Sequence, residues 1–399
     1  MTLIAEKWRT LAGSLVANTA EHATALKAQG REIFDLTSGE PDFDTPLNAS
    51  REAHRAIDDG DTKYTATDGS LEMKRAVSFK LSRDNKLEYR AENICIGSGA
   101  KSLVFHALFS ILDAGDEVIV PTPTWSSFPG MVEITGAKPV LLPCTSDTGY
   151  KLSAEQLREA ITDNTKCLII NNPCNPTGAV YARKELKALG EVLTARPQIA
   201  VVADEIYEHL VYDVDFTSFV GANPALKERT ISINGASKGY AMTGWRIGYA
   251  SGPHEVMETM RKLLSQSTGN PSSISQRAAI EALRGPQAFL HDRARKYAAR
   301  RDKAIALLNA APGLVNSTPQ GAFYLYPDCR NIFGRKTPGG IRILSSDDLC
   351  HYFLDSQGVA TVPSSAFYAE GNFRISYACA DSVLEEACRR IVTACQSLT

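Results

Sequence analysis

The sequence predicts an α/β protein with a mostly parallel sheet covered by helices, together with a smaller α+β domain. Three observations lead to this fold class. Short, almost continuously apolar segments alternate with amphipathic segments between residues 94 and 251, as in parallel strands joined by helices. After residue 320 short strands and helices are mixed, which is typical of α+β structure. A chain of 399 residues is also long for one core.

The N-terminal part alternates helical and breaker-rich segments. Residues 3–30 read as helical and are followed by a short strand at 31–36. Residues 38–46 contain too many Gly, Pro and Asp residues for regular structure. Helical periodicity returns at residues 48–58 and 69–86.

The middle of the chain supplies the predicted sheet. Its helices are expected at 102–112, 153–162 and 183–195. Its strands are expected at 93–97, 117–121, 138–142, 166–171, 199–204, 230–234 and 248–251.

The last part of the chain has a different character. A long helical region runs from about residue 255 to 300, with a break at 269–271. Short strands follow at 322–326, 358–362 and 373–377, and a helix covers 381–397. We expect these segments to form the smaller domain.

Composition excludes several functional classes. A net charge of −2 and the lack of a basic run give no general attraction to nucleic acid or to anionic membranes. No apolar run approaches the roughly 18 residues of a membrane span. Residues 1–7 lack an apolar signal segment, and nine cysteines without a CxxC pair suggest buried, reduced thiols. We therefore expect a cytoplasmic protein without a metal site.

The segment from Ser232 to Tyr249 contains the most informative residues. Lys238 follows a β-branched strand, where burial lowers the pKa of a lysine and leaves the neutral amine that carbonyl chemistry requires. Arg246 offers a planar fork of donors suited to a phosphate. A solvated loop lysine at position 238 is the competing interpretation.

Other polar residues follow strand ends, where ligands bind in open α/β sheets. Residues 98–101 open a helix and offer free amides to a phosphate, although a plain tight turn explains them equally well. Asp204 ends an apolar strand and could pair with a cationic ring nitrogen or cap a helix. Tyr207 follows by one turn, Trp125 could stack on a ring or fill the core, and Asn175 is held between prolines.

Together these residues supply a phosphate cradle, a stacking ring, an acid, hydrogen-bond donors and an amine. Pyridoxal phosphate requires this combination. The motifs Asn171–Gly178, Asp204–Tyr207, Ser237–Lys238 and Gly244–Arg246 resemble those of the class I and II aminotransferases of fold type I, close to the bacterial aspartate aminotransferase branch. The resemblance runs from Ser38 to Tyr377.

The resemblance implies roles around the cofactor ring. Lys238 binds the cofactor covalently and then acts as the base. Asp204 pairs with the pyridinium nitrogen, while Asn175 and Tyr207 bind the phenolic oxygen and Trp125 stacks on the ring. The residues implied at the phosphate are Gly99, Ala100, Lys101, Ser237 and Arg246, with Tyr64 reaching across a homodimer to the neighbouring site.

The resemblance also implies substrate contacts and domain limits. Arg374 and the Gly39 amide would hold the α-carboxylate; a strand-edge arginine in a surface ion pair is the alternative for Arg374. The implied limits are residues 46–295 for the cofactor-binding domain, and 1–45 with 296–399 for a small domain built from both termini. Cis bonds are expected at Thr122-Pro123 and Asn175-Pro176.

The expected reaction is ping-pong exchange of an amino group between an L-amino acid and a 2-oxo acid. The expected donor is aspartate- or glutamate-like. The sequence lacks two features of dicarboxylate-using relatives, so either a dicarboxylate is held differently or the donor is aromatic or neutral. This chain has Ala12-Gly13-Ser14 at the place where such relatives have a segment like Lys-Pro-Ser. Residues 105–110 contain no lysine, although relatives often have one there for the side-chain carboxylate. Gly235 also replaces a phosphate-binding serine of some relatives. A β-lyase, decarboxylase or synthase reaction on the same cofactor is the alternative, and a non-catalytic regulatory domain is a third hypothesis.

Overall fold

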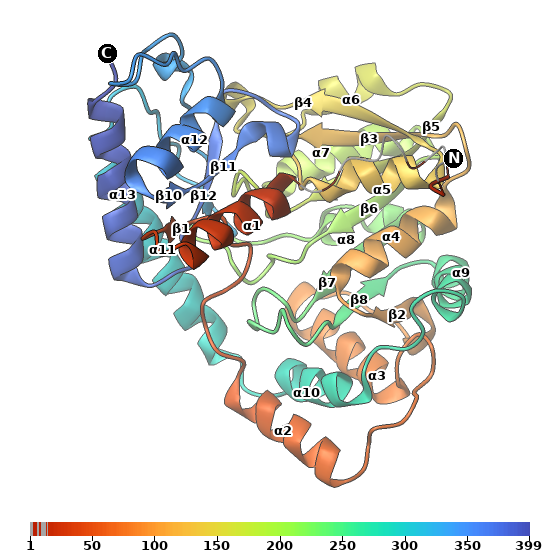
Figure 1. Cartoon of the computed structure of the whole chain (residues 1–399). Coiled ribbons are helices and arrows are strands. Elements are labelled where there is room, and N and C mark those ends of the chain that lie inside the picture. Colours follow the sequence, from red (N-terminus) through yellow and green to blue (C-terminus); the bar gives the residue numbers. More distant parts are fainter. Residues whose placement is uncertain (1–2, 6–7, 9–12, 14) are drawn as a thin grey trace.

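A seven-stranded sheet forms the centre of the protein in the computed structural model, which describes residues 3–5, 8, 13 and 15–399 (Figure 1). Every strand is parallel to the others except β8, which runs antiparallel between β2 and β7. Apart from the edge strand β4, whose residues are exposed or half-buried, the strands are almost wholly buried because helices cover both faces. In sheet order they are β2 (Ile94–Gly97), β8 (Gly248–Ser251), β7 (Thr230–Gly235), β6 (Ala200–Asp204), β5 (Thr165–Asn171), β3 (Glu117–Thr122) and β4 (Lys138–Pro143).

Three groups of helices pack against this sheet, each around a separate apolar cluster. On one face lie α4 (Ala100–Ile111), α5 (Ser127–Thr135) and α9 (His254–Ser265). On the other face lie α6 (Ala154–Ala160), α7 (Arg183–Thr194) and α8 (Phe219–Ala222). Around the β2 edge lie α2 (Leu47–Asp58), α3 (Leu71–Lys80) and α10 (Ser273–Arg284).

Segments from the N-terminal and C-terminal parts of the chain come together in a second body beside the sheet (Figure 1). Strand β1 (Phe34–Asp35) pairs in parallel with β10 (Val359–Ala360), so the N-terminal segment joins the C-terminal region. A three-stranded antiparallel sheet consists of β11 (Val362–Pro363), β12 (Phe373–Ser376) and β9 (Tyr324–Leu325). The helices of this body are α1 (Leu15–Ala28), α11 (Ala288–Leu308), α12 (Ser346–Gln357) and α13 (Asp381–Gln396).

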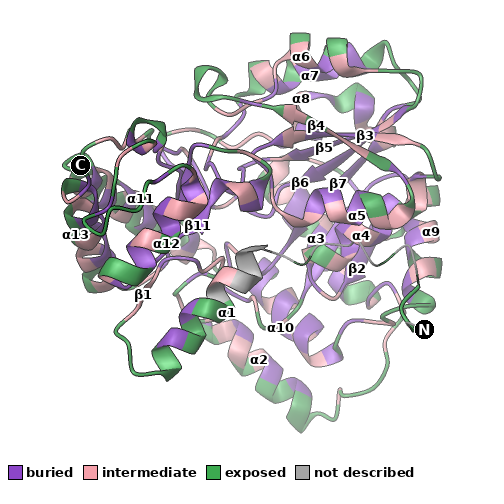
Figure 2. Cartoon of the chain, turned by 45° about the horizontal axis from the view of Figure 1, so that its top comes forward, coloured by how far each residue is buried: buried purple, intermediate pink, exposed green. Residues whose placement is uncertain are grey.

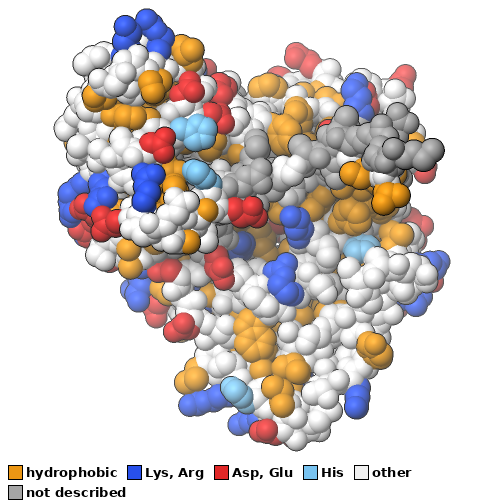
Figure 3. Space-filling view, in the orientation of Figure 1, with side chains coloured by type: hydrophobic (Ala, Val, Ile, Leu, Met, Phe, Trp, Pro, Cys, Tyr) orange, Lys and Arg blue, Asp and Glu red, His pale blue; other side chains and the backbone are white. Residues whose placement is uncertain are grey.

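The buried residues follow this arrangement: Figure 2 shows them along the central strands and on the inward sides of the helices. The described helices include none with both the length and the apolar character needed to cross a membrane. On the surface, hydrophobic side chains are visible over the lower part of the molecule in Figure 3, where α2 lies. Between the start of α2 and Tyr64, the large exposed hydrophobic residues are Leu47, Ile57 and Tyr64.

Several elements differ from the sequence expectation. The first described helix begins at Leu15, and of the residues expected before it 6–7, 9–12 and 14 lie outside the described part. Strand β1 has only two residues. Helix α5 was not expected, and α3 ends in a π-helical turn at Leu81–Asn85. Both expected cis bonds are present, and Asn172-Pro173 is a third.

Candidate active site

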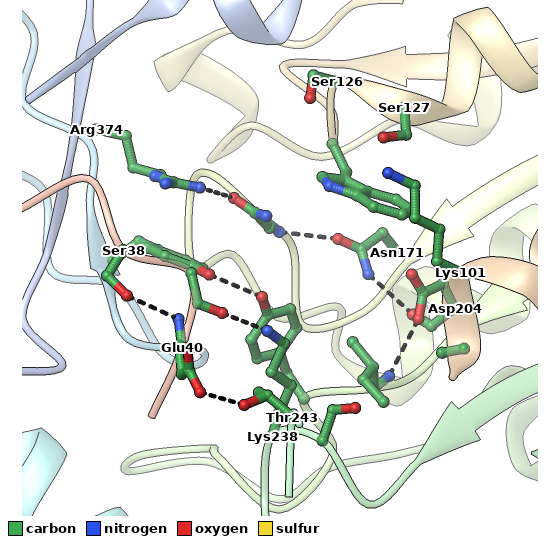
Figure 4. A pocket seen from close by; sticks show the side chains of 18 of the residues that line it. Ser38, Glu40, Lys101, Ser126, Ser127, Asn171, Asp204, Lys238, Thr243 and Arg374 are labelled. Carbon is green, nitrogen blue, oxygen red and sulfur yellow. Dashed lines mark hydrogen bonds between the residues drawn. The ribbon is translucent and has the colours of Figure 1, made fainter. Parts of the chain in front are cut away.

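A cavity of about 470 Å³ opens at the carboxyl ends of β5, β6 and β7. Side chains from the central sheet meet the 37–40 segment, β9 and β12 there, and Figure 4 shows them directed toward a common space. Except for Gly99 and Tyr64, all the predicted site residues line this cavity. They are Gly39, Ala100, Lys101, Trp125, Asn175, Asp204, Tyr207, Ser237, Lys238, Arg246 and Arg374.

Lys238 lies at the floor of the cavity, directly after β7. Its Nζ donates a hydrogen bond to the Gly39 carbonyl oxygen and lies 5.9 Å from the centroid of the Tyr207 ring. Burial, followed by the charge of Arg374, lowers the pKa of Lys238 to about 8. Near neutral pH this lysine therefore loses its proton much more readily than a solvated lysine, so the interpretation as a solvated loop lysine does not hold.

Asp204 supplies a buried acid opposite this lysine. Its side chain ends β6, the residue is 6% exposed, and Oδ1 accepts a hydrogen bond of 3.2 Å from the Ile206 amide. Burial raises the pKa of Asp204 to about 7, against the opposing effect of Lys238. No cationic side chain of the described residues forms an ion pair with this carboxylate. Its surroundings therefore suit a protonated ring nitrogen in the cavity.

Amides at the start of α4 and one guanidinium form a cradle at the cavity. Gly99 has φ +87°, and a Cβ there would lie 2.4 Å from Nη2 of Arg246. Only glycine allows the guanidinium to lie this close to the free amides of the helix. Arg246 donates to the Thr243 carbonyl oxygen at 2.7 Å, and Ser237 lies beside it in the cavity. Such a set of donors fits a phosphate group.

Arg374 occupies the opposite side of the cavity, on β12. It is 2% exposed, and its Nη1 and Nη2 donate to Asn175 Oδ1 at 3.0 Å and to the Thr37 carbonyl oxygen at 2.6 Å. Its Nε has no partner among the described residues. Burial lowers the pKa of Arg374, and no described carboxylate pairs with it. The alternative of a surface ion pair is therefore wrong, and this cation is available to an anionic ligand.

Comparisons with known proteins agree with this arrangement. The family model for aminotransferase class I and II matches residues 31–391. The chain belongs to this family. It is 49% identical to an aspartate/prephenate aminotransferase of Cereibacter sphaeroides over 94% of each chain, and 45% identical to an aspartate aminotransferase of Rhizobium meliloti over 97% of this chain and 94% of the relative.

Solved structures give the same result. The crystal structure of the aspartate aminotransferase from Rhizobium meliloti superposes with a TM-score of 0.97, at 44% identity and full coverage of both chains. The Thermus thermophilus aspartate aminotransferase with maleate gives 0.92, at 37% identity and coverage of 99% and 100%. The aminotransferase therefore depends on pyridoxal phosphate and has fold type I, which confirms the predicted family, fold class and cofactor. The donors, acid and amine of its cavity fit this cofactor.

Several residues in the cavity of this aminotransferase were not predicted. Asn171 ends β5 and could have been found by the rule that selected Asp204, since both are polar residues after an apolar strand. Tyr324 lies within an aromatic run of the C-terminal region and gave no such signal. The remaining residues of this kind are Thr37, Ser38, Glu40, Ser126, Ser127, Ile206 and Thr243.

Two of the departures from the relatives, residues 105–110 and Gly235, do not line the cavity of the aminotransferase. Residues 105–110 do not line it, whereas Lys101 at the start of the same helix does. Ala12 and Ser14 lie outside the described residues. At Gly235 a Cβ would lie 2.8 Å from the Ile247 carbonyl oxygen, so a serine does not fit there without a shift.

Proposed function

We propose that this aminotransferase takes its amino group from a dicarboxylic L-amino acid, aspartate first of all, in the cavity around Lys238. The observation that carries the proposal is the number of cations in the cavity. Lys238 and Arg246 serve the cofactor, and this leaves Arg374 and Lys101, at separate places on the wall, for two carboxylates. The relatives named aspartate and aspartate/prephenate aminotransferase support the same choice of donor.

The proposed roles at the cofactor follow from the contacts. Pyridoxal phosphate supplies a carbonyl group that accepts the amino group and a ring that takes up electrons. Asp204 holds the proton on the ring nitrogen, while Asn175 and Tyr207 bind the phenolic oxygen and Trp125 stacks on the ring. Lys238 holds the cofactor covalently. Once released, it takes the proton from the substrate Cα and returns it, because its lowered pKa makes it both a base and an acid near neutral pH.

We propose that both main-chain amides and side chains contact the phosphate. The amides of Gly99, Ala100 and Lys101 begin α4, where the helix dipole favours an anion. Ser237 and Arg246 complete the set. This leaves the side chain of Lys101 free of the phosphate, and its Nζ lies 5.3 Å from the centroid of the Trp125 ring.

The proposed substrate contacts lie at two ends of the cavity. Arg374 binds the α-carboxylate with help from the Gly39 amide, and the ammonium of Lys101 binds the side-chain carboxylate. Lys101 lines the cavity near Ser126 and Ser127, and no described carboxylate forms an ion pair with it. Burial, followed by repulsion from Arg246, lowers the pKa of Lys101, and a bound carboxylate would reverse this effect.

A Lys101→Gln variant tests the choice of donor. We expect kcat/KM for aspartate to fall by about 10- to 100-fold, the value of one partly buried charged hydrogen bond, while kcat/KM for phenylalanine changes little. Lys184→Gln, in an exposed part of α7, is the matched control. Equal losses for aspartate and phenylalanine would contradict the role of Lys101, and a higher kcat/KM for phenylalanine than for aspartate in the wild type would favour an aromatic donor.

We also propose that the enzyme is a cytoplasmic homodimer in which Tyr64 completes the neighbouring phosphate site. Tyr64 is 96% exposed and does not line the cavity of its own subunit. A free thiol at each of the nine cysteines suits a reducing compartment. Size-exclusion chromatography with light scattering should give twice the chain mass of 43.3 kDa. Tyr64→Phe should weaken cofactor binding about fivefold; a monomer with full cofactor affinity would contradict the proposal.

A further inference from the structure

Tyr324 contacts both ends of the candidate site. It lies on β9 with no exposed surface. Its hydroxyl oxygen is 2.9 Å from the hydroxyl oxygen of Tyr207, and its ring centroid is 4.4 Å from Cζ of Arg374. A Cβ added to Gly39 would lie 3.4 Å from the same hydroxyl. One side chain therefore touches the groups proposed to bind the cofactor ring and the substrate α-carboxylate.

We propose that Tyr324 is a positioning residue with two separate functions. Its hydroxyl directs the proton of Tyr207 toward the cofactor, and its ring holds the guanidinium of Arg374 in place for the α-carboxylate. The inference rests on the proposed roles of Tyr207 and Arg374. It concerns how those residues are kept in their working orientation.

The first function follows from counting protons. A tyrosine hydroxyl has one proton to donate, and its oxygen can accept a hydrogen bond at the same time. If Tyr207 donates its proton to the phenolic oxygen of the cofactor, it has none left for Tyr324. The proton between the two hydroxyls must then come from Tyr324.

The surroundings of the pair supply no competing hydrogen-bond partner among the described residues. Neither hydroxyl has a second protein partner. The charged groups that face them are Arg374 from β12, Asp204 from β6, and Lys238 after β7. Burial raises the pKa of both tyrosines, so both keep their protons across the neutral range. Two protons are therefore present: one joins the hydroxyls and the other is available to a ligand.

The bond from Tyr324 also strengthens the one that Tyr207 makes. A hydroxyl that accepts a hydrogen bond becomes a better donor, because the bonds of a chain polarise one another. A stronger donor at the phenolic oxygen stabilises negative charge there. The Tyr324 hydroxyl would therefore lower the pH midpoint of the absorption change of the cofactor-loaded enzyme, and its removal would raise that midpoint.

The second function depends on the ring alone. Arg374 is almost fully buried, and its planar guanidinium lies over the Tyr324 ring on one side, with the Phe367 ring centroid 5.1 Å from Cζ. Such cation–π contacts hold a desolvated guanidinium in a fixed plane. A bidentate bond to a carboxylate requires that plane.

Two substitutions separate the functions in the cofactor-loaded enzyme. Tyr324→Phe keeps the ring and removes the hydroxyl. We expect the pH midpoint of the absorption change to rise and kcat to fall about fivefold, the value of one hydrogen bond, with the KM for aspartate nearly unchanged. Tyr324→Leu removes both, and the KM should rise as well. The matched control is Tyr249→Phe, which removes a buried hydroxyl without a partner among the described residues.

Tyr207→Phe serves as the reference for the result. An unchanged pH midpoint in Tyr207→Phe would show that Tyr207 does not act at the phenolic oxygen, and the hydroxyl part of the inference would fall with it. A raised midpoint in Tyr207→Phe but not in Tyr324→Phe would overturn the inference alone. An aspartate KM that is the same in Tyr324→Leu and Tyr324→Phe would overturn the role of the ring. Melting curves of all variants check that they fold.

Discussion

Burial controls the chemistry of single residues in this cavity. It lowers the pKa of Lys238 to about 8 and raises that of Asp204 to about 7, so that both groups are shifted toward their neutral forms. Lys238 becomes able to give and take a proton near neutral pH. Asp204 remains an acid without a cationic partner, which a protonated ring nitrogen can provide.

Replacing Asp204 by Asn should stabilise the enzyme from which the cofactor has been removed. Between its ordinary value of 3.8 and about 7, the folded protein keeps the Asp204 proton while the unfolded chain has lost it. Stability of the cofactor-free wild type therefore falls as pH rises through this window. The asparagine side chain of the variant does not titrate, so at pH 8 the free energy of unfolding of the variant should exceed that of the wild type by an amount on the order of 4 kcal/mol. Thermal melts from pH 4 to 8 measure it.

The exposed Asp163→Asn is the control for this experiment. It should follow the wild-type pH profile. Parallel profiles for wild type and Asp204→Asn would contradict the assignment of Asp204 as an uncompensated buried acid.

At the residue scale, the sequence predicted those site residues whose charge is unusual for their position. Lys238, Asp204 and Arg246 are charged residues beside apolar strands or within glycine-rich turns, and the structure brings them into one cavity. Tyr324 was missed because an aromatic residue in an apolar strand has the pattern of a core residue. Its site contact depends on tertiary packing between β9 and β12, which the local pattern does not contain.

At the scale of single elements, the cradle depends on how closely α4 approaches Arg246. Gly99→Ala should displace the guanidinium, since the new methyl group would lie 2.4 Å from Nη2. We expect the dissociation constant for pyridoxal phosphate to rise at least about tenfold, equal to about 1.4 kcal/mol. Fluorescence titration of the cofactor-free protein measures this constant.

Gly115→Ala is a close control, because Gly115 also has a positive φ, +95°, but nothing lies within 4 Å of its added Cβ. This variant should lose stability through backbone strain while keeping its cofactor affinity. If both variants bound the cofactor with the affinity of the wild type, the phosphate cradle would not depend on the close approach of Arg246 to Gly99.

A buried ion pair fixes the turn that follows β6. Lys80, with no exposed surface, pairs with Glu208, one residue after Tyr207. Burial opposes the charge of Glu208, but Lys80 and His209 outweigh it and lower its pKa. Lys80→Met should therefore cost about 3–5 kcal/mol, because it leaves a buried carboxylate without its partner.

The double variant Lys80→Met/Glu208→Leu tests this explanation. It should be less destabilised than Lys80→Met alone, since no unpaired charge remains. Urea unfolding curves of the cofactor-free proteins provide the comparison. If the effects of the two substitutions simply added, the pair would not be coupled in the way the contact implies.

At the scale of the whole molecule, the site depends on segments that are far apart in the chain. The pairing of β1 with β10 carries the 37–40 segment to the cavity, so that Gly39 meets Lys238. The rule that ligands bind at the carboxyl ends of strands located the large-domain half of the site. Apolar periodicity also gave the seven strands of the main sheet. It did not give the reversed direction of β8 or helix α5, because strand direction and a short helix containing Gly and Pro leave no periodic signal.

The domain limits remain a prediction. The proposed boundary at 295/296 falls within α11, a helix of 21 residues whose Tyr297, Ala304 and Leu308 pack in the core of the smaller body. A domain boundary can be located from the sequence where the periodicity breaks. A continuous helix such as α11 has no such break, so the sequence does not locate a boundary within it.

The central claim is that the cavity around Lys238 transfers the amino group of aspartate. The most direct test mixes the pyridoxal-phosphate-loaded enzyme with L-aspartate in the absence of any acceptor, and measures absorption and products together. We predict loss of the lysine-bound cofactor band, with oxaloacetate formed in equal amount to the active sites and the amino group retained on the enzyme. Release of ammonia or carbon dioxide, or reaction with aromatic amino acids but not with aspartate, would contradict the account.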